Sequence, residues 1–225
     1  MQADQAQKLD EVLDAGGFFT RNCAALKKSK YPDHFAEAAE AEREATAIRE
    51  YAPLLIPGLL QTEAYAQAVF RGGLPTATEE AIDELVAARL ERGQLLTDPT
   101  TPLVWVVLDE AVLRRHNGSP AVMAEALRHT TALVRRHRVI VQVLPFSAGA
   151  HMALEGPLKL MSFPGAPSLA YLQGLGTGQL QDDPATVRQY ELTYDLVAAS
   201  ALSPKASLAL IESVAEDYDH ADQQL

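Results

Sequence analysis

The chain has 225 residues, 48% of them hydrophobic and 22% charged, so it can bury a core and does not have the composition of a disordered protein. It carries 30 acidic and 19 basic side chains, and this net charge of −11 argues against a chain that binds nucleic acid by itself. The single cysteine, Cys23, excludes an internal disulfide and a cysteine-based zinc site. We also expect a cytoplasmic protein without membrane contact, because the polar start is not a signal peptide and no apolar run approaches the ~20 residues of a membrane span.

The N-terminal half has the pattern of successive helices. We predict a short helix over residues 5–13, ended by glycines, and a long helix over residues 34–51 that is rich in Ala and Glu. Residues 35–48 of the long helix include an alanine-rich face that permits close packing, and Glu42 is expected on its solvated side.

Two threonines predict the starts of the next two helices. Thr62 precedes a helix that runs to about residue 70, and Thr78 precedes one that runs to about residue 96. In the second helix, Arg89 and Arg92 lie three residues apart. We expect them to pair with acidic residues of the same helix, with a paired anion site as the alternative.

Four apolar runs in the middle of the chain predict strands, because they are short, β-branched and bounded by turn residues. They cover residues 103–108, 139–144, 158–163 and 169–172. A helix over residues 120–137 joins the first two runs, whereas a Gly- and Pro-containing turn joins the last two, so the sheet should be mixed. The glycines of residues 174–178 indicate a flexible loop.

Two C-terminal helices, beginning at Pro184 and Pro204, complete the prediction. In the first of them we expect Leu192 and Leu196 to face mostly inward. The fold class is therefore α+β: a helical N-terminal half, a central mixed sheet of about four strands with a crossover helix, and two C-terminal helices. We expect a single domain over residues 31–218, preceded by a separate segment over 1–30 and followed by an acidic tail over 219–225.

The chemistry-bearing residues gather where the first two predicted strands end. Asp109, Glu110 and Arg114 follow the first strand, and the loop from Pro145 to His151 follows the second. If these strands are parallel neighbours, the two loops meet, and Glu110 and His151 then frame a small polar pocket for a ligand. The alternative is that Glu110 and Arg114, four residues apart, simply pair on one helix.

No motif for a nucleophile with a base, a metal cluster or a phosphate loop is present, so the sequence indicates neither catalysis nor a cofactor.

Several segments together resemble a known family. They are Leu55–Ala66 with the run Pro57, Gly58, Leu59, Leu60, Gln61, Thr62, Glu63, Tyr65; Ala88–Arg92 with Arg89 and Arg92; Val106–Arg115; Val141–Phe146 with Gly149–His151; and Ala201–Ser203. In this order they resemble the C-terminal domain of actinobacterial XRE-type helix-turn-helix regulators, the WhiJ-like or Scr-family antitoxin-like proteins, over about residues 5–215. Gln173 departs from the family pattern, in which an acidic residue is expected.

The resemblance implies a transcriptional regulator whose N-terminal helix-turn-helix is missing here, in agreement with the acidic charge. It implies a regulatory domain that senses a small-molecule effector, binds a small protein encoded by an adjacent gene, or dimerises. A second hypothesis is an enzyme or degenerate enzyme with a pocket at Asp109, Glu110 and His151. A third is an oligomerisation module whose seam is the alanine face of residues 35–48.

Overall fold

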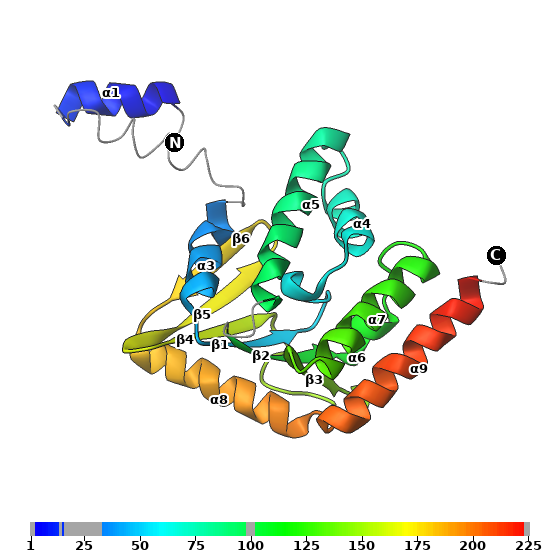
Figure 1. Ribbon diagram of the computed structural model, residues 1–225. Helices are drawn as coiled ribbons and strands as arrows, with labels where there is room; N and C mark the ends of the chain where they lie inside the picture. The colour runs from blue at the N-terminus through cyan, green and yellow to red at the C-terminus, as the bar shows by residue number, and fades with distance from the viewer. Residues whose placement is uncertain (1–2, 14, 16–32, 98–101, 223–225) are drawn as a thin grey trace.

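A computed structural model describes residues 3–13, 15, 33–97 and 102–222 (Figure 1). Its α-helices are α1 (Ala3–Leu13), α3 (Asp33–Glu44), α4 (Glu63–Gly73), α5 (Glu79–Gly93), α6 (Glu110–Arg114), α7 (Pro120–Arg135), α8 (Pro184–Ser200) and α9 (Pro204–Asp222). Short 3₁₀ turns are η1 (Gly58–Leu60), η2 (Gln94–Leu96) and η3 (Phe146–Ala148). The strands are β1 (Ala47–Ala52), β2 (Leu103–Asp109), β3 (Val139–Leu144), β4 (Leu158–Phe163), β5 (Ala166–Gly174) and β6 (Thr177–Gln181).

One mixed sheet joins all six of these strands in the order β3-β2-β1-β4-β5-β6. β1, β2 and β3 are parallel, with helices in both crossovers, and β4, β5 and β6 continue the sheet as an antiparallel meander. The α+β class is therefore confirmed, and the mixed character of the sheet with it. The expected number of about four strands is wrong, because β1 and β6 were not recognised.

β1 lies inside the region that the sequence assigned to one long helix. That helix, α3, ends at Glu44, and the chain then enters the sheet between β2 and β4. Ala, Glu and Arg favour a helix locally, but Ile48 pairs with both Val104 and Met161, so distant strands override the local preference.

β6 lies where the sequence predicted a flexible glycine loop. Gly174 pairs with Thr177 and closes a tight turn whose Gly176 has a positive φ of 66°, so two of the three glycines serve a hairpin. The third, Gly178, lies in β6, where an added Cβ would be 2.7 Å from the His34 carbonyl oxygen of α3. A glycine is needed there because a helix end approaches the strand closely.

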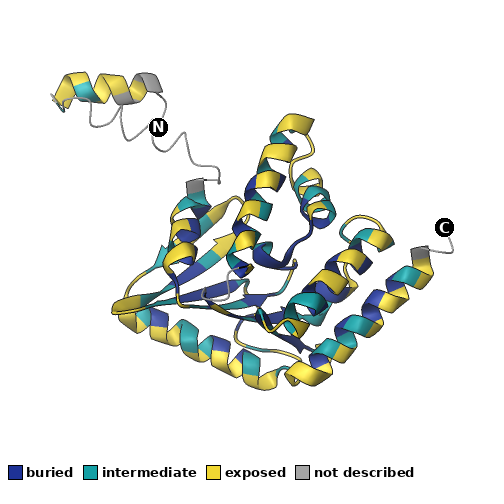
Figure 2. Cartoon of the chain, viewed as in Figure 1, coloured by how far each residue is buried: buried dark blue, intermediate teal, exposed yellow. Residues whose placement is uncertain are grey.

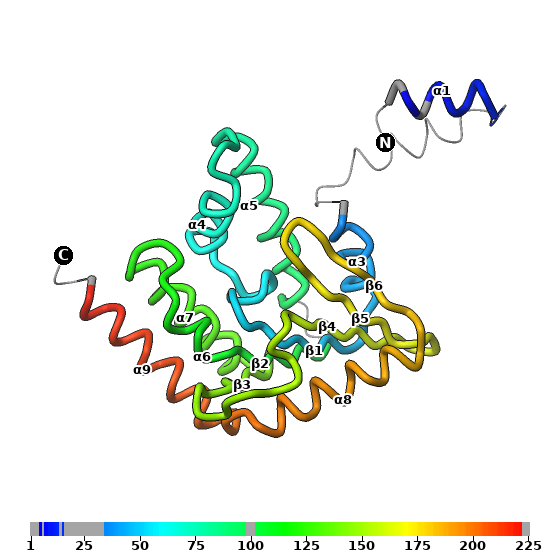
Figure 3. The backbone as a smooth tube through the Cα atoms, turned by 180° about the vertical axis from the view of Figure 1, so that it is seen from behind, coloured from blue at the N-terminus to red at the C-terminus, as the bar shows by residue number. Residues whose placement is uncertain are grey.

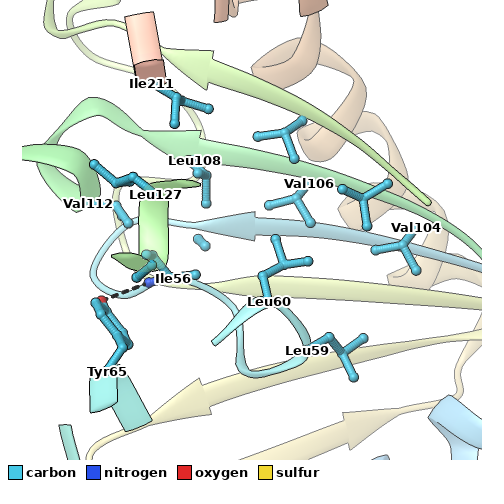
Figure 4. Close-up of a cluster of buried hydrophobic side chains, with 14 of the residues drawn as sticks. Ile56, Leu59, Leu60, Tyr65, Val104, Val106, Leu108, Val112, Leu127 and Ile211 are labelled. Carbon is cyan, nitrogen blue, oxygen red and sulfur yellow. Dashed lines mark hydrogen bonds between the residues drawn. The ribbon is translucent and has the colours of Figure 1, made fainter. Parts of the chain in front are cut away.

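Helices cover both faces of the sheet (Figures 1 and 2). α4, α5 and α7 lie on one face, and α8 runs along the other. The larger core cluster combines residues of η1, β2, α7 and α9, as the close-up in Figure 4 shows for Leu60, Val106, Leu127 and Ile211. A second cluster lies between the sheet and α8 and contains Tyr51 of β1 and Tyr194 of α8. Seen from behind, α8 and α9 follow one another along one side of the molecule (Figure 3).

The starts of four helices agree with the sequence prediction. Side-chain oxygens of Thr62, Thr78, Ser119 and Ser203 accept backbone N–H groups at the starts of α4, α5, α7 and α9, as expected. The inward orientation expected for Leu192 and Leu196 is wrong, because they are 55% and 46% exposed on α8.

One predicted boundary differs from the structure, and three predicted features concern residues that the structure does not describe. α9 continues to Asp222, so the boundary predicted at residue 218 falls inside a helix. The glycines predicted to end the first helix, Gly16 and Gly17, and the lone Cys23 lie outside the described residues.

Candidate functional site

The carboxyl ends of β1, β2 and β3 lie at one edge of the sheet, because these strands are parallel. The segment 145–157, which we call the strand-end loop, crosses this edge. The Phe146 N–H donates to Glu110 Oε2, 3.1 Å away, beyond the end of β2. Further on, His151 Nε2 lies 3.3 Å from the hydroxyl of Tyr51 in β1, and Gly156 lies beside the Gln173 carbonyl of β5. The two predicted loops therefore meet.

A three-residue polar centre of Tyr51, Asp109 and His151 fastens the middle of this loop. The Tyr51 hydroxyl donates its single hydrogen to Asp109 Oδ2 at 3.2 Å, because an ionised carboxylate can only accept. With the Tyr51 hydrogen directed at Asp109, His151 Nε2 can bond the Tyr51 oxygen only as a donor. Burial and the neighbouring Asp109 raise the pKa of Tyr51 above its ordinary value, so the phenol stays protonated.

The two carboxylates of the site are already engaged by the protein. Asp109 Oδ1 caps α6 by accepting from the Ala111 N–H at 2.9 Å, while its Oδ2 accepts from Tyr51. Glu110 Oε1 pairs with Arg114 at 3.2 Å, and Oε2 holds the Phe146 N–H. The alternative of a Glu110–Arg114 helix pair is therefore confirmed. Each of the four carboxylate oxygens therefore has a contact that holds α6, Tyr51 or the strand-end loop.

The remaining predicted site residues lie at its margins. Pro145 starts η3, and its carbonyl accepts from the Ala148 N–H at 2.9 Å. Gln173 is exposed near the end of β5, and its backbone carbonyl is the group near the loop. His151 Nδ1 is buried and has no hydrogen-bond partner, so it is the unsatisfied polar atom of the centre.

The strand-end loop also carries exposed apolar side chains. Phe146, Met152 and Leu154 are 61%, 59% and 63% exposed on the strand-end loop, and Leu54 is similarly exposed beyond the end of β1. Large apolar side chains gain nothing from contact with water, so an exposed group of them is typical of a contact surface.

The residues of the family-like motif gather in a second cluster, between η1 and α5. Gln61 donates from Nε2 to the Ile56 carbonyl at 2.6 Å and accepts from Arg89 Nη1 at 2.7 Å. Gly58 lies under both arginines, and an added Cβ would be 2.8 Å from Arg92 Nη2. Nearby, Tyr65 accepts from the Ile56 N–H at 3.1 Å and from Asn117 at 3.0 Å (Figure 4 shows the bond to Ile56). The motif therefore locks the entry of α4 against α5.

A buried ion network adjoins this cluster. Glu42 of α3 is completely buried and pairs with Arg92 of α5 at 2.8 Å and with Lys159 of β4, which also pairs with Glu50 at 3.1 Å. Burial raises the pKa of Glu42, but the two cations outweigh it and leave that pKa below its ordinary value.

This network corrects two predictions. Glu42 is not on a solvated face, because α3 turns it toward β4. Arg92 pairs with Glu42 of another helix. Arg89 donates to Gln61 and stacks on Phe70, and it does not pair with an acidic residue of α5. Burial and the neighbouring Arg92 lower the pKa of Arg89 to about 10. The sequence reasoning missed Tyr51 and Lys159 as well. A lysine inside the apolar run of β4 was a signal that a buried partner exists.

Two surface hollows accompany α5. One of about 310 Å³ is lined by Glu42, Arg43, Glu91, Arg92, Gln94 and Leu95. The other, of about 520 Å³, follows the outer side of α5 from Ala81 to Glu91. Neither borders Glu110 or His151, so the small pocket between those residues stays a prediction.

A family model described as a domain of unknown function, DUF5753, matches residues 35–213. The chain belongs to the DUF5753 family. No curated protein matches it. The matched part of this DUF5753 domain includes the sheet, the strand-end loop and the buried ion network.

The described part of the DUF5753 chain has neither a metal-binding cluster nor a membrane-spanning helix. Within the described ranges, no group of three or more His, Cys, Asp or Glu residues is arranged to hold a metal ion. None of the helices described here combines the length and apolar character needed to cross a bilayer.

Proposed function

We propose that this chain is the regulatory domain of an antitoxin-like helix-turn-helix transcriptional regulator, and that the strand-end loop binds a small protein encoded by an adjacent gene. The observation that carries the proposal is the exposure of Phe146, Met152 and Leu154 on a loop whose polar anchors point inward. The order of sequence segments resembling such regulators supports it, as does the net charge of −11, which disfavours DNA binding by this domain itself.

The loop has the properties that a partner surface needs. Three apolar side chains stand on a backbone fixed by Glu110 and Tyr51, so little conformational entropy is lost when a partner covers them. The occupied carboxylates also favour binding over catalysis, and we propose that the domain is not an enzyme.

Native mass spectrometry of the purified chain, alone and with the product of the neighbouring gene, tests this proposal. We expect a stoichiometric complex. A double variant, Phe146→Ser with Met152→Ser, should weaken it by at least about tenfold, because apolar anchors near the centre of an interface carry most of its affinity.

The matched control is Leu192→Ser with Leu196→Ser on α8, which removes similarly exposed apolar side chains from another surface. The control should bind as the unchanged chain does. Equal weakening by both double variants, or no complex at all, would refute the assignment of the loop as the partner surface.

A second candidate is a small-molecule effector site or a degenerate enzyme site at the polar centre. The buried, unpartnered Nδ1 of His151 favours it, because a polar group of a ligand would satisfy that atom. Such a site should retain a small molecule in native mass spectrometry or show a ligand-dependent rise in melting temperature. If Glu110→Gln leaves ligand binding, partner binding and fold unchanged, this candidate is eliminated.

A further inference from the structure

The two edge strands of the sheet, β3 and β6, differ in whether the backbone groups on their outer sides are hydrogen-bonded. β3 is protected by the connection between α8 and α9 and by the first turn of α9. There the Leu202 N–H donates to the Val143 carbonyl at 2.9 Å, and the Val143 N–H donates to Ser207 Oγ at 2.9 Å. Both outward backbone groups of Val143 are therefore occupied, as expected for an edge that must not pair with another chain.

β6, at the opposite edge, has no hydrogen-bonded neighbour on its outer side among the described residues, and the start of α3 approaches it at Gly178. Its pairing with β5 closes at Gly174 and Thr177, so the groups of residues 177, 179 and 181 face β5. The N–H and C=O groups of Gly178 and Leu180 consequently point away from the sheet. The strand contains no charge and no proline, and its pairing with β5 has no bulge. Charged residues, prolines and bulges are the features by which natural sheets block an edge, and β6 has none of them.

We propose that two copies of this chain associate by pairing β6 with β6 of the second copy in antiparallel orientation. Placing Gln179 opposite its own counterpart lets Gly178 of each copy bond Leu180 of the other. This twofold register uses all four outward groups on each strand. The proposal does not depend on the partner proposed for the strand-end loop.

Self-pairing suits the chemistry of this strand better than pairing with a charged segment. Because Thr177–Gln181 is neutral, two copies of a chain with net charge −11 meet here without direct like-charge repulsion. Two facing Gln179 amides can donate and accept reciprocally. The same register also places Leu175, fully exposed at the hairpin tip, alongside the end of the other strand.

Sedimentation or light scattering of the full chain from about 1 to about 100 µM tests the proposal, because a short strand pair gives a modest, concentration-dependent dimer. Gln179→Lys should weaken the dimer by about tenfold or more, since it opposes two like charges on the twofold axis. Gln189→Lys, the same change on an exposed position of α8, should leave it unchanged. A monomer throughout the range, or a dimer indifferent to Gln179→Lys, would overturn the proposal.

A cross-linking experiment tests the register itself. In a Cys23→Ser background, Gln179→Cys should form an intermolecular disulfide under mild oxidation, because facing residues that are not hydrogen-bonded have Cα atoms about 4.5 Å apart. Gln189→Cys is the control and should remain a monomer on a non-reducing gel. A dimer that forms without cross-linking at residue 179 would show that the copies meet elsewhere. The alanine face expected as an oligomerisation seam is not that surface, because Ala38 and Ala45 are 1% and 6% exposed within the core.

Discussion

At the scale of single residues, the completely buried Glu42 is a charged side chain that depends on its partners. Its carboxylate would be costly to bury alone, and it is tolerated because Arg92 and Lys159 approach it from α5 and β4. The interaction fixes the position of three elements, although its net contribution to stability is smaller than the attraction between the charges, because all three groups lose water.

Replacing Glu42 by Gln should lower the free energy of unfolding by about 3 kcal/mol, because two buried cations lose their shared carboxylate. Urea denaturation followed by circular dichroism measures the change. Glu44→Gln, on the exposed side of the same helix, is the control and should stay within about 0.5 kcal/mol. Equal effects at the two positions would show that the network contributes nothing specific.

The same residue predicts a pH dependence. The pKa of Glu42 is lower in the folded chain than its ordinary value of 4.5, so its contribution is present above pH 4.5 and is lost as the pH falls through the folded pKa. The melting temperature of the unchanged chain should therefore fall more steeply below about pH 4.5 than that of Glu42→Gln. Parallel curves for the two proteins would contradict the prediction.

Gly58 and Gly72 should respond oppositely to alanine. At Gly58 a Cβ would collide with Arg92, which Glu42 holds in place, so we expect a loss of about 1–3 kcal/mol. At Gly72 nothing lies within 4 Å, and the position is helical, so alanine should stabilise by up to about 1 kcal/mol. Thermal unfolding of both variants makes the comparison, and a neutral Gly58→Ala would mean that the arginines move aside freely.

At the scale of elements, the strand-end loop is held by a few polar contacts, and Tyr51 is central to them. Tyr51→Phe removes the hydroxyl that joins Asp109 to His151, so amide hydrogen exchange of residues 147–154 should become faster. Tyr194→Phe on α8 also loses one buried hydroxyl, which donates to the Trp105 carbonyl, and should not accelerate exchange in the loop specifically. Unchanged exchange in Tyr51→Phe would show that the loop is fixed by its ends alone.

The elements that the sequence predicted well are those with a strong local signal. The ranges of β3 and β4 and the capped starts of α4, α5, α7 and α9 follow from apolar runs and from hydroxyl-bearing caps. β1 was missed because its Ala, Arg and Glu residues favour helix and its pairing partners come from far along the chain. β6 was missed because Gly and Gln have low strand propensity.

The candidate site shows the same division between local and distant information. That the loops containing Glu110 and His151 would meet followed from the parallel order of two recognised strands. Tyr51 could not be added to them, because β1 itself was not recognised. Gln61, Arg89 and Arg92 were selected by resemblance, and their partners Glu42 and Lys159 belong to elements whose arrangement only the complete sheet determines.

At the scale of the whole molecule, the sheet combines a parallel half and an antiparallel half, and β1 joins them. The parallel half ends in the strand-end loop, and the antiparallel half ends in the unprotected edge of β6. Two separate surfaces, one for a different protein and one for a second copy, are therefore compatible with each other. A complex of two chains with two partners is the assembly we expect when both proposals hold.

The pairing of Glu42 with Lys159, 117 residues further along, also constrains how the chain matures during synthesis. While the first half is being synthesised, Glu42 already has Arg92 as a partner but lacks Lys159 and β4, so its complete burial has to wait for them. Assembly of the centre is thus postponed until β4 has emerged, and the preceding residues depend on remaining soluble until then. The net charge of −11 favours the solubility of the incomplete chain before β4 is made, because like-charged nascent segments repel one another.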